Sequence, residues 1–240
     1  MTIPRLMLGL ILAIAATMSA VAEEPVHPMP AMADTAIFMH GVLDQFESRT
    51  DAFRWSGAAW VGGDRDKLWL KSEGFALGRG TVEDGRHELL YDRAISAYAD
   101  LQAGVRVDWD SGVGRTWAAL GVQGMAPLFF NYEATAYFGD RGRAAARLAV
   151  SHDIALTQRA ILQPLVELNF YSKSDPARGL GSGLSDIDTG LRLRYEINRK
   201  IAPYVGIAYA ERCGETAQMA RRAGDTTGGV HFVFGIRNWF

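Results

Sequence analysis

Apolar and polar residues alternate along most of the chain with a period of two, which is the period of a β-strand. The clearest stretch is residues 100–109, where every second residue is apolar and the residues between are mostly charged or polar. The pattern recurs over residues 143–150, 162–171 and 186–197. Such stretches reach about ten residues, which is typical of tilted membrane strands and exceeds the usual length in soluble sheets.

This alternation predicts an all-β fold, an antiparallel transmembrane β-barrel of about twelve strands. A barrel of ten strands also fits the pattern, because strand ends are the least certain part of such a prediction. The expected strands are residues 36–47, 53–62, 66–76, 87–94, 98–110, 115–124, 129–139, 143–152, 160–171, 184–198, 200–212 and 228–240.

The connections between these strands differ in length. Longer connections, rich in Gly, Asp, Arg and Ser, are expected at residues 77–86, 172–183 and 213–227, and they broadly alternate with short turns. Outer-membrane barrels alternate in this way, with short periplasmic turns and longer external loops. An even strand number places both ends of the barrel in the periplasm, and Cys213 then begins an external loop.

The first residues have the layout of a signal peptide. Arg5 precedes an apolar run from Leu6 to Met18, and Ala20-Val21-Ala22 forms a cleavage site of small residues. The apolar run is shorter than the roughly 20 residues of a membrane-spanning helix. We therefore expect a signal peptide over residues 1–22, a short disordered periplasmic Met/His/Pro segment over 23–35, and the barrel over 36–240.

The last residues have the layout of a final barrel strand. Phe232, Phe234, Ile236 and Phe240 share one face of the predicted strand, and Asn238 interrupts that face. Outer-membrane barrels end in this way, on a strand of alternating apolar residues with a terminal Phe. The expected location is the bacterial outer membrane.

Charge and cysteine content narrow the function further. The formal net charge is −2, so no nucleic-acid partner is implied. Cys213 is the only cysteine, so an intramolecular disulfide cannot stabilise the chain. A closed barrel offers another source of stability, because every strand is paired.

If the apolar faces meet lipid, the charged faces line the lumen. Two interpretations stay open: the charges form salt bridges that fill a small barrel, or they line a polar path or binding site. The residues expected to face inward are Asp100, Arg106, Asp108, Arg143, Arg147, Glu167, Asp186, Asp188, Arg192, Arg194 and Glu196.

Methionine and histidine supply candidate copper ligands. Thioether and imidazole groups together suit copper, and soft sulfur ligands select Cu(I). Weaker candidates within the predicted barrel are His87, Met125 and His231. The alternative is chance spacing of the methionines, and His87 and His231 can equally fill the lumen. The main candidates lie within 14 residues of one another near the start of the chain: His27, Met29, Met32, Met39 and His40.

No catalytic constellation is present in the sequence, which lacks a G-x-S-x-G elbow, an H-E-x-x-H helix and a phosphate-binding glycine loop. Ser151 and His152 are neighbours, but adjacent residues of a strand point to opposite faces. We therefore do not expect an enzyme.

A family resemblance rests on residues 66–74, 91–96, 100–106, 121–124, 134–140, 156–159, 161–164, 167–170, 179–186 and 191–196. These stretches, in order over roughly residues 55–240, resemble the copper resistance protein B family of outer-membrane proteins. The chain departs from the family at Ala97, where proline is common, and at Asn238, where an aromatic residue is more usual.

The resemblance implies a barrel that takes part in copper resistance and copper homeostasis, with copper ions, outer-membrane lipid and periplasmic copper-handling proteins as partners. Family members often carry a longer Met/His-rich region at the N-terminus, which here is reduced to residues 27–40. The leading hypothesis is a barrel that binds copper ions or passes them across the outer membrane. The alternatives are a passive or structural small pore and, third, a barrel enzyme that acts on lipid.

Overall fold

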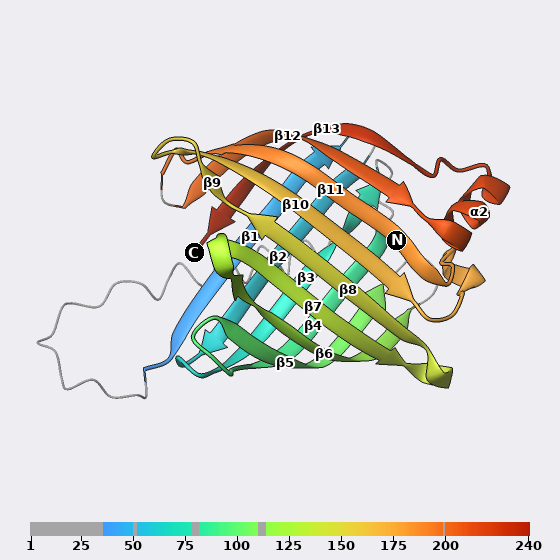
Figure 1. Ribbon diagram of the computed structural model, residues 1–240, viewed down its shortest axis with the longest axis horizontal. Coiled ribbons are helices and arrows are strands. Elements are labelled where there is room, and N and C mark those ends of the chain that lie inside the picture. Colours follow the sequence, from blue (N-terminus) through green and yellow to red (C-terminus); the bar gives the residue numbers. More distant parts are fainter. Residues whose placement is uncertain (1–35, 50–51, 78–81, 110–113, 199) are drawn as a thin grey trace, which may run out of the picture.

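The computed structural model describes residues 36–49, 52–77, 82–109, 114–198 and 200–240. In this part of the chain nearly all residues belong to one antiparallel sheet that closes on itself, because each strand pairs with its neighbours in sequence and the first strand pairs with the last (Figure 1). The predicted signal peptide (residues 1–22) and the Met/His/Pro segment (residues 23–35) lie outside the described residues.

Twelve long strands form the wall, so the predicted twelve-stranded barrel is confirmed and the ten-stranded alternative is wrong. A thirteenth strand, β9 (Ile154–Ala155), has two residues and extends the hairpin between β8 and β10. The long strands are β1 (Phe38–Arg49), β2 (Ala52–Gly62), β3 (Asp66–Leu77), β4 (Val82–Ala94), β5 (Ala99–Trp109), β6 (Arg115–Ala126), β7 (Phe130–Gly139), β8 (Ala144–His152), β10 (Ala160–Tyr171), β11 (Gly183–Tyr195), β12 (Ile201–Arg212) and β13 (Gly228–Trp239).

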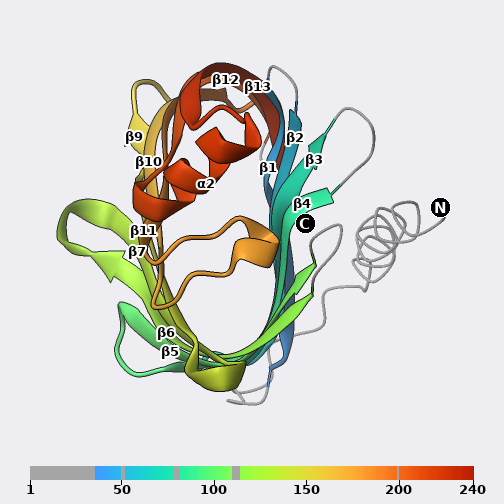
Figure 2. The same ribbon diagram turned by 90° about the vertical axis from the view of Figure 1, so that its right-hand side faces the viewer.

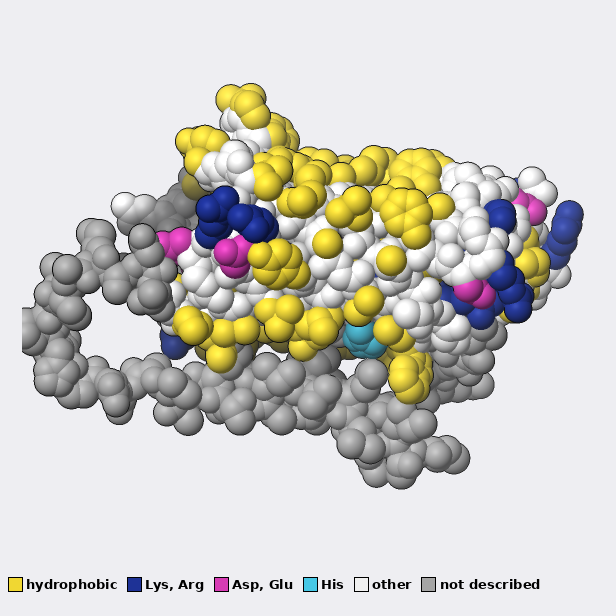
Figure 3. All heavy atoms as spheres, turned by 90° about the horizontal axis from the view of Figure 1, so that it is seen from below, with side chains coloured by type: hydrophobic (Ala, Val, Ile, Leu, Met, Phe, Trp, Pro, Cys, Tyr) yellow, Lys and Arg dark blue, Asp and Glu magenta, His cyan; other side chains and the backbone are white. Residues whose placement is uncertain are grey.

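The alternation along each strand sorts side chains between the lumen and the outside. On β5, Arg106 and Asp108 are 2% and 1% exposed, whereas Val105 and Val107 are 47% and 38% exposed. Apolar side chains gather along the barrel wall, and charged ones are concentrated toward its two ends (Figure 3). This is the inverse of a soluble sandwich, and it suits a wall that is surrounded by lipid.

The two ends of the barrel differ. Phe240 lies at the end with the short turns, which we call the terminal end; the other end, which we call the loop end, carries the connections 172–182 and 213–227 (Figure 1). Outer-membrane barrels keep short turns on the periplasmic side, so the terminal end faces the periplasm. Cys213 lies at the loop end, as predicted.

One predicted external loop contains a helix. The sequence predicts a loop over residues 213–227, but this connection includes α2 (Gly214–Ala223), which covers part of the loop end (Figure 2). Glu215 lies in its first turn, Arg221 and Arg222 lie in its last turn, and Gly224 ends it in the left-handed conformation at φ 82°, all of which favour a helix here. Among the described residues, no helix is long and apolar enough to span a membrane.

A second difference concerns β4, which begins at Val82 rather than at residue 87. Much of the predicted loop from 77 to 86 is therefore strand. Its polar composition favours a loop, but pairing with β5 continues through Gly85 opposite Trp109 and Arg86 opposite Asp108. A register shift against β3 and a positive φ at Asp84 accompany this extension.

The C-terminal residue takes part in closing the barrel. Phe240 and Gly41 exchange two backbone hydrogen bonds, from the Phe240 N–H to the Gly41 carbonyl at 2.9 Å and from the Gly41 N–H to the Phe240 carbonyl at 3.3 Å. These bonds lie at the seam between β1 and β13, where the first and last strands meet.

Deletion of Phe240 should lower the amount of folded barrel in the membrane, because the seam loses two backbone hydrogen bonds together with the terminal side chain of the last strand. Folded barrels resist unfolding in cold SDS since their strand bonds close internally. The measurement is the fraction that migrates as a compact band before boiling. An unchanged fraction at several expression levels would contradict the prediction.

Candidate functional site: the charged lumen

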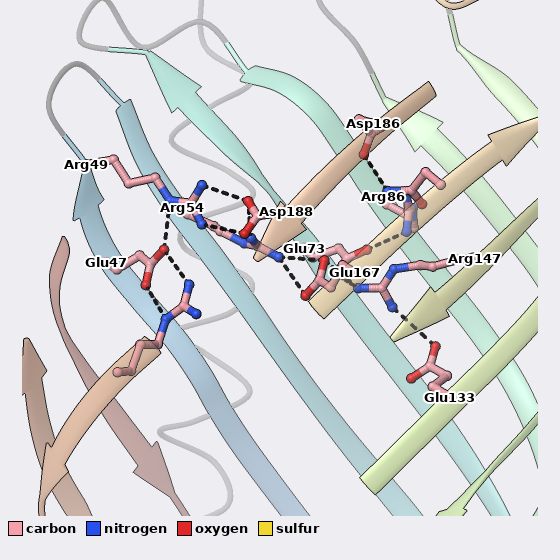
Figure 4. Close-up of polar contacts among 12 residues, drawn as sticks. Glu47, Arg49, Arg54, Glu73, Arg86, Glu133, Arg147, Glu167, Asp186 and Asp188 are labelled. Carbon is pink, nitrogen blue, oxygen red and sulfur yellow. Dashed lines mark hydrogen bonds and ion pairs between the residues drawn. The ribbon is translucent and has the colours of Figure 1, made fainter. Parts of the chain in front are cut away.

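The lumen is crossed by ion pairs whose centre is Arg54 on β2. Its guanidinium donates to Glu167 on β10 at 2.9 Å and to Asp188 on β11 at 2.9 Å. These three side chains come from opposite walls of the barrel and meet inside it (Figure 4). The Arg54 side chain is 4% exposed and the two carboxylates are each 11% exposed, so the pairs are shielded from bulk water.

From Asp188 the ion pairs continue toward β1. Arg49 donates to Asp188 at 2.7 Å and to Glu47 at 2.8 Å, so it links the two carboxylates. Glu47 also accepts from Arg192 at 3.0 Å and from the Tyr204 hydroxyl at 3.1 Å. Glu47 is fully buried, and its donors supply the charge and hydrogen bonds that a buried carboxylate requires.

From Glu167 the ion pairs continue in the other direction, through Arg147 on β8. Arg147 approaches Glu167 at 3.1 Å, Glu73 at 2.9 Å and Glu133 at 3.3 Å. Two further cations then bind the outer carboxylates: Arg86 donates to Glu73 at 2.7 Å, and Lys71 donates to Glu133 at 2.9 Å.

Together these residues form one continuous network with alternating signs of charge, which we call the septum. Each buried charge faces at least one opposite charge, which offsets part of the cost of removing it from water. The septum consists of Glu47, Arg49, Arg54, Lys71, Glu73, Arg86, Glu133, Arg147, Glu167, Asp188 and Arg192.

Two cavities meet at the septum. The terminal-side cavity has a volume of about 770 Å³ and the loop-side cavity about 550 Å³. Glu73, Arg86 and Glu167 line both of them. These three side chains therefore lie where the two cavities adjoin.

Both interpretations of the lumen charges find support. Arg147, Glu167, Asp188 and Arg192 were predicted to face inward, and they are buried in the septum. They form salt bridges, and cavities remain on both sides of them. Glu196 was also predicted to face inward, but β11 ends before it, at Tyr195.

Sequence reasoning missed the septum residues of β1 to β4 and Glu133 on β7. On β1 the alternation is interrupted by a register shift between Leu43 and Gln45, so inward positions change parity along that strand. The detectable signal was the alternation after the shift, in which Gln45, Glu47 and Arg49 occupy every second position.

The candidate metal ligands that the structure describes do not come together. Met39 and His40 lie at the start of β1, with the His40 ring 6.1 Å from that of Trp60. Met125 lines the terminal-side cavity and His231 lines the loop-side cavity, on the other side of the septum. In the described part of the chain, no three His, Cys, Asp or Glu residues are grouped so that they could hold a metal ion. Outside it lie His27, Met29 and Met32.

His87 does not fill the lumen, contrary to one of the two sequence-based interpretations. Its neighbours Glu88 and Leu90 are buried toward the lumen, and Leu89, which has the same parity as His87, is 47% exposed on the outer face. The His87 ring contacts the Ser72 hydroxyl at 3.1 Å. The alternation places His87 on the outside because it precedes the inward-facing Glu88 by one residue.

Comparisons with known proteins give a consistent result. A family model described as "Copper resistance protein B precursor (CopB)" matches residues 37–240. Copper resistance protein B of Escherichia coli is 45% identical over 214 residues, which cover 88% of this chain and 72% of that protein. A copper resistance protein B homolog of Pseudomonas syringae pv. tomato is 44% identical over 211 residues, which cover 86% of this chain and 71% of that protein.

Among solved structures, the NanC porin matches with a TM-score of 0.53 and 13% identity, over 85% of this chain and 99% of that chain. At this identity the match concerns the fold alone. It supports a porin-like barrel fold.

Replacing Glu167 with Gln should lower the free energy of unfolding by about 3 kcal/mol, because Arg54 and Arg147 lose a shared buried carboxylate. Urea unfolding in lipid vesicles, followed by tryptophan fluorescence, measures the change. The matched control is Asp140→Asn, which removes a carboxylate that is 59% exposed and should change stability little. Equal effects of the two substitutions would contradict the assigned role of the septum.

Proposed function

Because this chain belongs to the copper resistance protein B family, we propose that it serves copper resistance at the outer membrane by binding copper ions or by passing them across that membrane. The observation that carries the proposal is the family match over residues 37–240, which includes the whole barrel wall. The protein is thus a copper resistance protein of the outer membrane, and copper itself is its proposed cargo.

Soft donors at the terminal end support copper as the cargo. Met39 and His40 begin β1, directly after the segment that contains His27, Met29 and Met32. Thioethers favour Cu(I), and imidazoles hold both Cu(I) and Cu(II). We propose that these five residues form the principal copper site, at the periplasmic mouth. Met125, which lines the adjacent cavity, is a secondary candidate, together with His87 and His231.

The lumen supports the transport form of the proposal. Carboxylates of the lumen attract cations without selecting copper, among them Glu167 and Asp188 in the septum and Asp186 in the loop-side cavity. A cation that crosses must compete with Arg54, Arg86 and Arg147 for these carboxylates. Periplasmic copper-handling proteins are the expected partners at the terminal end.

The first alternative, a passive or structural barrel, accounts for the septum without any copper site, and copper titration of the purified protein separates it from the main proposal. For the other alternative, an enzyme that acts on lipid, the residues considered for a catalytic site are Ser151 and His152. His152 Nδ1 instead lies 3.2 Å from the Phe129 carbonyl, and its ring stacks on Phe130. We propose a non-enzymatic role, and activity of the purified barrel on phospholipid would contradict it.

Replacing His27, Met29, Met32, Met39 and His40 together should weaken Cu(I) binding and leave the barrel folded. The reason is that the principal soft donors proposed for the periplasmic mouth are removed, whereas the septum is unchanged. Isothermal titration with Cu(I) and copper survival of a complemented deletion strain are the two measurements.

The matched control is Met219→Leu on α2, which removes a methionine at the loop end, away from the proposed site, and should leave Cu(I) binding unchanged. If Cu(I) binding and copper tolerance both survive the fivefold replacement, the N-terminal site is wrong. The same test then moves to His87, Met125 and His231.

A further inference from the structure

The connection between β10 and β11 folds over the loop end of the barrel. Residues 172–182, which we call the lid segment, contain the short 3-10 helix η4 (Pro176–Arg178) and cross the mouth in the view along the barrel (Figure 2). Asp175 and Leu180 exchange backbone hydrogen bonds at 2.7 and 3.1 Å, which give the segment a fixed shape. Leu180 packs into the buried cluster that includes Trp117 and Tyr171.

Ion pairs with residues of β5 and β6 hold the lid segment to the barrel wall. Arg178 donates to Asp108 at 2.7 Å, and Asp108, which is 1% exposed, also accepts from the Trp117 indole at 2.9 Å. Arg115 makes two hydrogen bonds to Asp175, at 2.9 and 3.2 Å. Buried and bidentate pairs of this kind fix geometry more firmly than exposed pairs.

The first turn of α2 also holds the lid segment, through hydrogen bonds. The Glu215 carboxylate accepts hydrogen bonds from the Ser174 hydroxyl at 2.5 Å and from the Ser182 N–H at 3.1 Å. The Thr216 hydroxyl accepts from the Gly181 N–H at 2.8 Å. The hydrogen bond from Ser174, followed by those from Ser182, lowers the pKa of Glu215, so this carboxylate stays ionised at neutral pH.

On the other side of the mouth, the described residues enclose the loop-side cavity. The loop-side cavity is lined by residues of β2, β3, β4 and β10 to β13, and Leu180 is the one lid residue that lines it among those described. Outside the septum, three carboxylates line this cavity against one arginine, which favours cations. The carboxylates are Asp84, Asp186 and Glu211, and the arginine is Arg212.

We propose that the lid segment determines which solutes enter the lumen from outside: it closes the β5 to β8 side of the mouth and confines entry to the acidic cavity on the other side. Small cations are then admitted, and larger or anionic solutes are excluded. We call the ion pair between Arg178 and Asp108 the latch. We call the hydrogen bonds of Glu215 and Thr216 to the lid segment the clasp. This proposal concerns access to the lumen and does not depend on the identity of the metal.

Thiol labelling tests the closed and open sides separately. In a Cys213→Ser background, Ala145→Cys places a thiol in the buried cluster that contains Leu180, and Ala210→Cys places one in the loop-side cavity. Matched cationic and anionic methanethiosulfonate reagents are the probes. The Ala210→Cys thiol should react faster with the cationic reagent, and the Ala145→Cys thiol should react slowly with both.

Releasing the latch should expose the closed side. Adding Asp108→Asn should accelerate labelling at Ala145→Cys about tenfold or more, which corresponds to about 1.4 kcal/mol in the opening equilibrium, and leave Ala210→Cys unchanged. Glu215→Ala releases the lid from the surface of the protein and serves as the second variant if Asp108→Asn weakens the barrel. Asp225→Asn, near the other end of α2, is the control, since Asp225 is 63% exposed.

Trypsin reports the movement of the lid independently, because it cleaves after arginine and the Arg178 side chain is 3% exposed in the closed lid. Both release variants should be cleaved after Arg178 faster than the parent, as identified by mass spectrometry. If cleavage increases while Ala145→Cys stays protected, the segment is not a lid. If neither cleavage nor labelling changes, the latch and clasp are wrongly assigned. Separately, equal labelling rates of the cationic and anionic reagents at Ala210→Cys would overturn the proposed preference for cations.

Discussion

The structure depends on one constraint: within a membrane, every backbone N–H and carbonyl of the wall must be paired inside the protein. The sheet therefore has to close, and the seam between β1 and β13, with the exchange between Gly41 and Phe240, is where it does so. Closure separates two environments, so each strand must present apolar residues to lipid and polar residues to the lumen. The charged interior follows from this alternation.

The charged interior creates a second constraint, because buried charges must be paired or solvated. In the septum, carboxylates share arginines: Arg54 forms ion pairs with two carboxylates and Arg147 with three. Pairs of this kind hold opposite walls together, and they also stand where the two cavities meet. If ions pass through the lumen, as proposed, the groups that connect the walls are also the groups they meet.

The sequence predicts what depends on local alternation, and it fails where distant pairing decides. The strands, the twelve-stranded barrel and the inward faces of β5, β8 and β10 follow from the period of two. The inward residues of β1 were missed because a register shift changes their parity. The first part of β4 was missed because pairing with β3 and β5, rather than an apolar pattern, makes it a strand. The helix α2 was detectable, since residues 214–224 carry charges and a terminal glycine that favour a helix.

Recognition of copper and passage through the barrel make different chemical demands. Arginines and carboxylates respond to charge and separate cations from anions, but they do not distinguish a soft ion from a hard one. Softness is recognised by thioether and imidazole groups, and in the described barrel Met39, His40 and Met125 lie toward the terminal end, on the periplasmic side of the septum. We infer that selection for copper takes place mainly at that mouth, with His231 of the loop-side cavity as a secondary donor, and that the lumen carboxylates add a preference for cations.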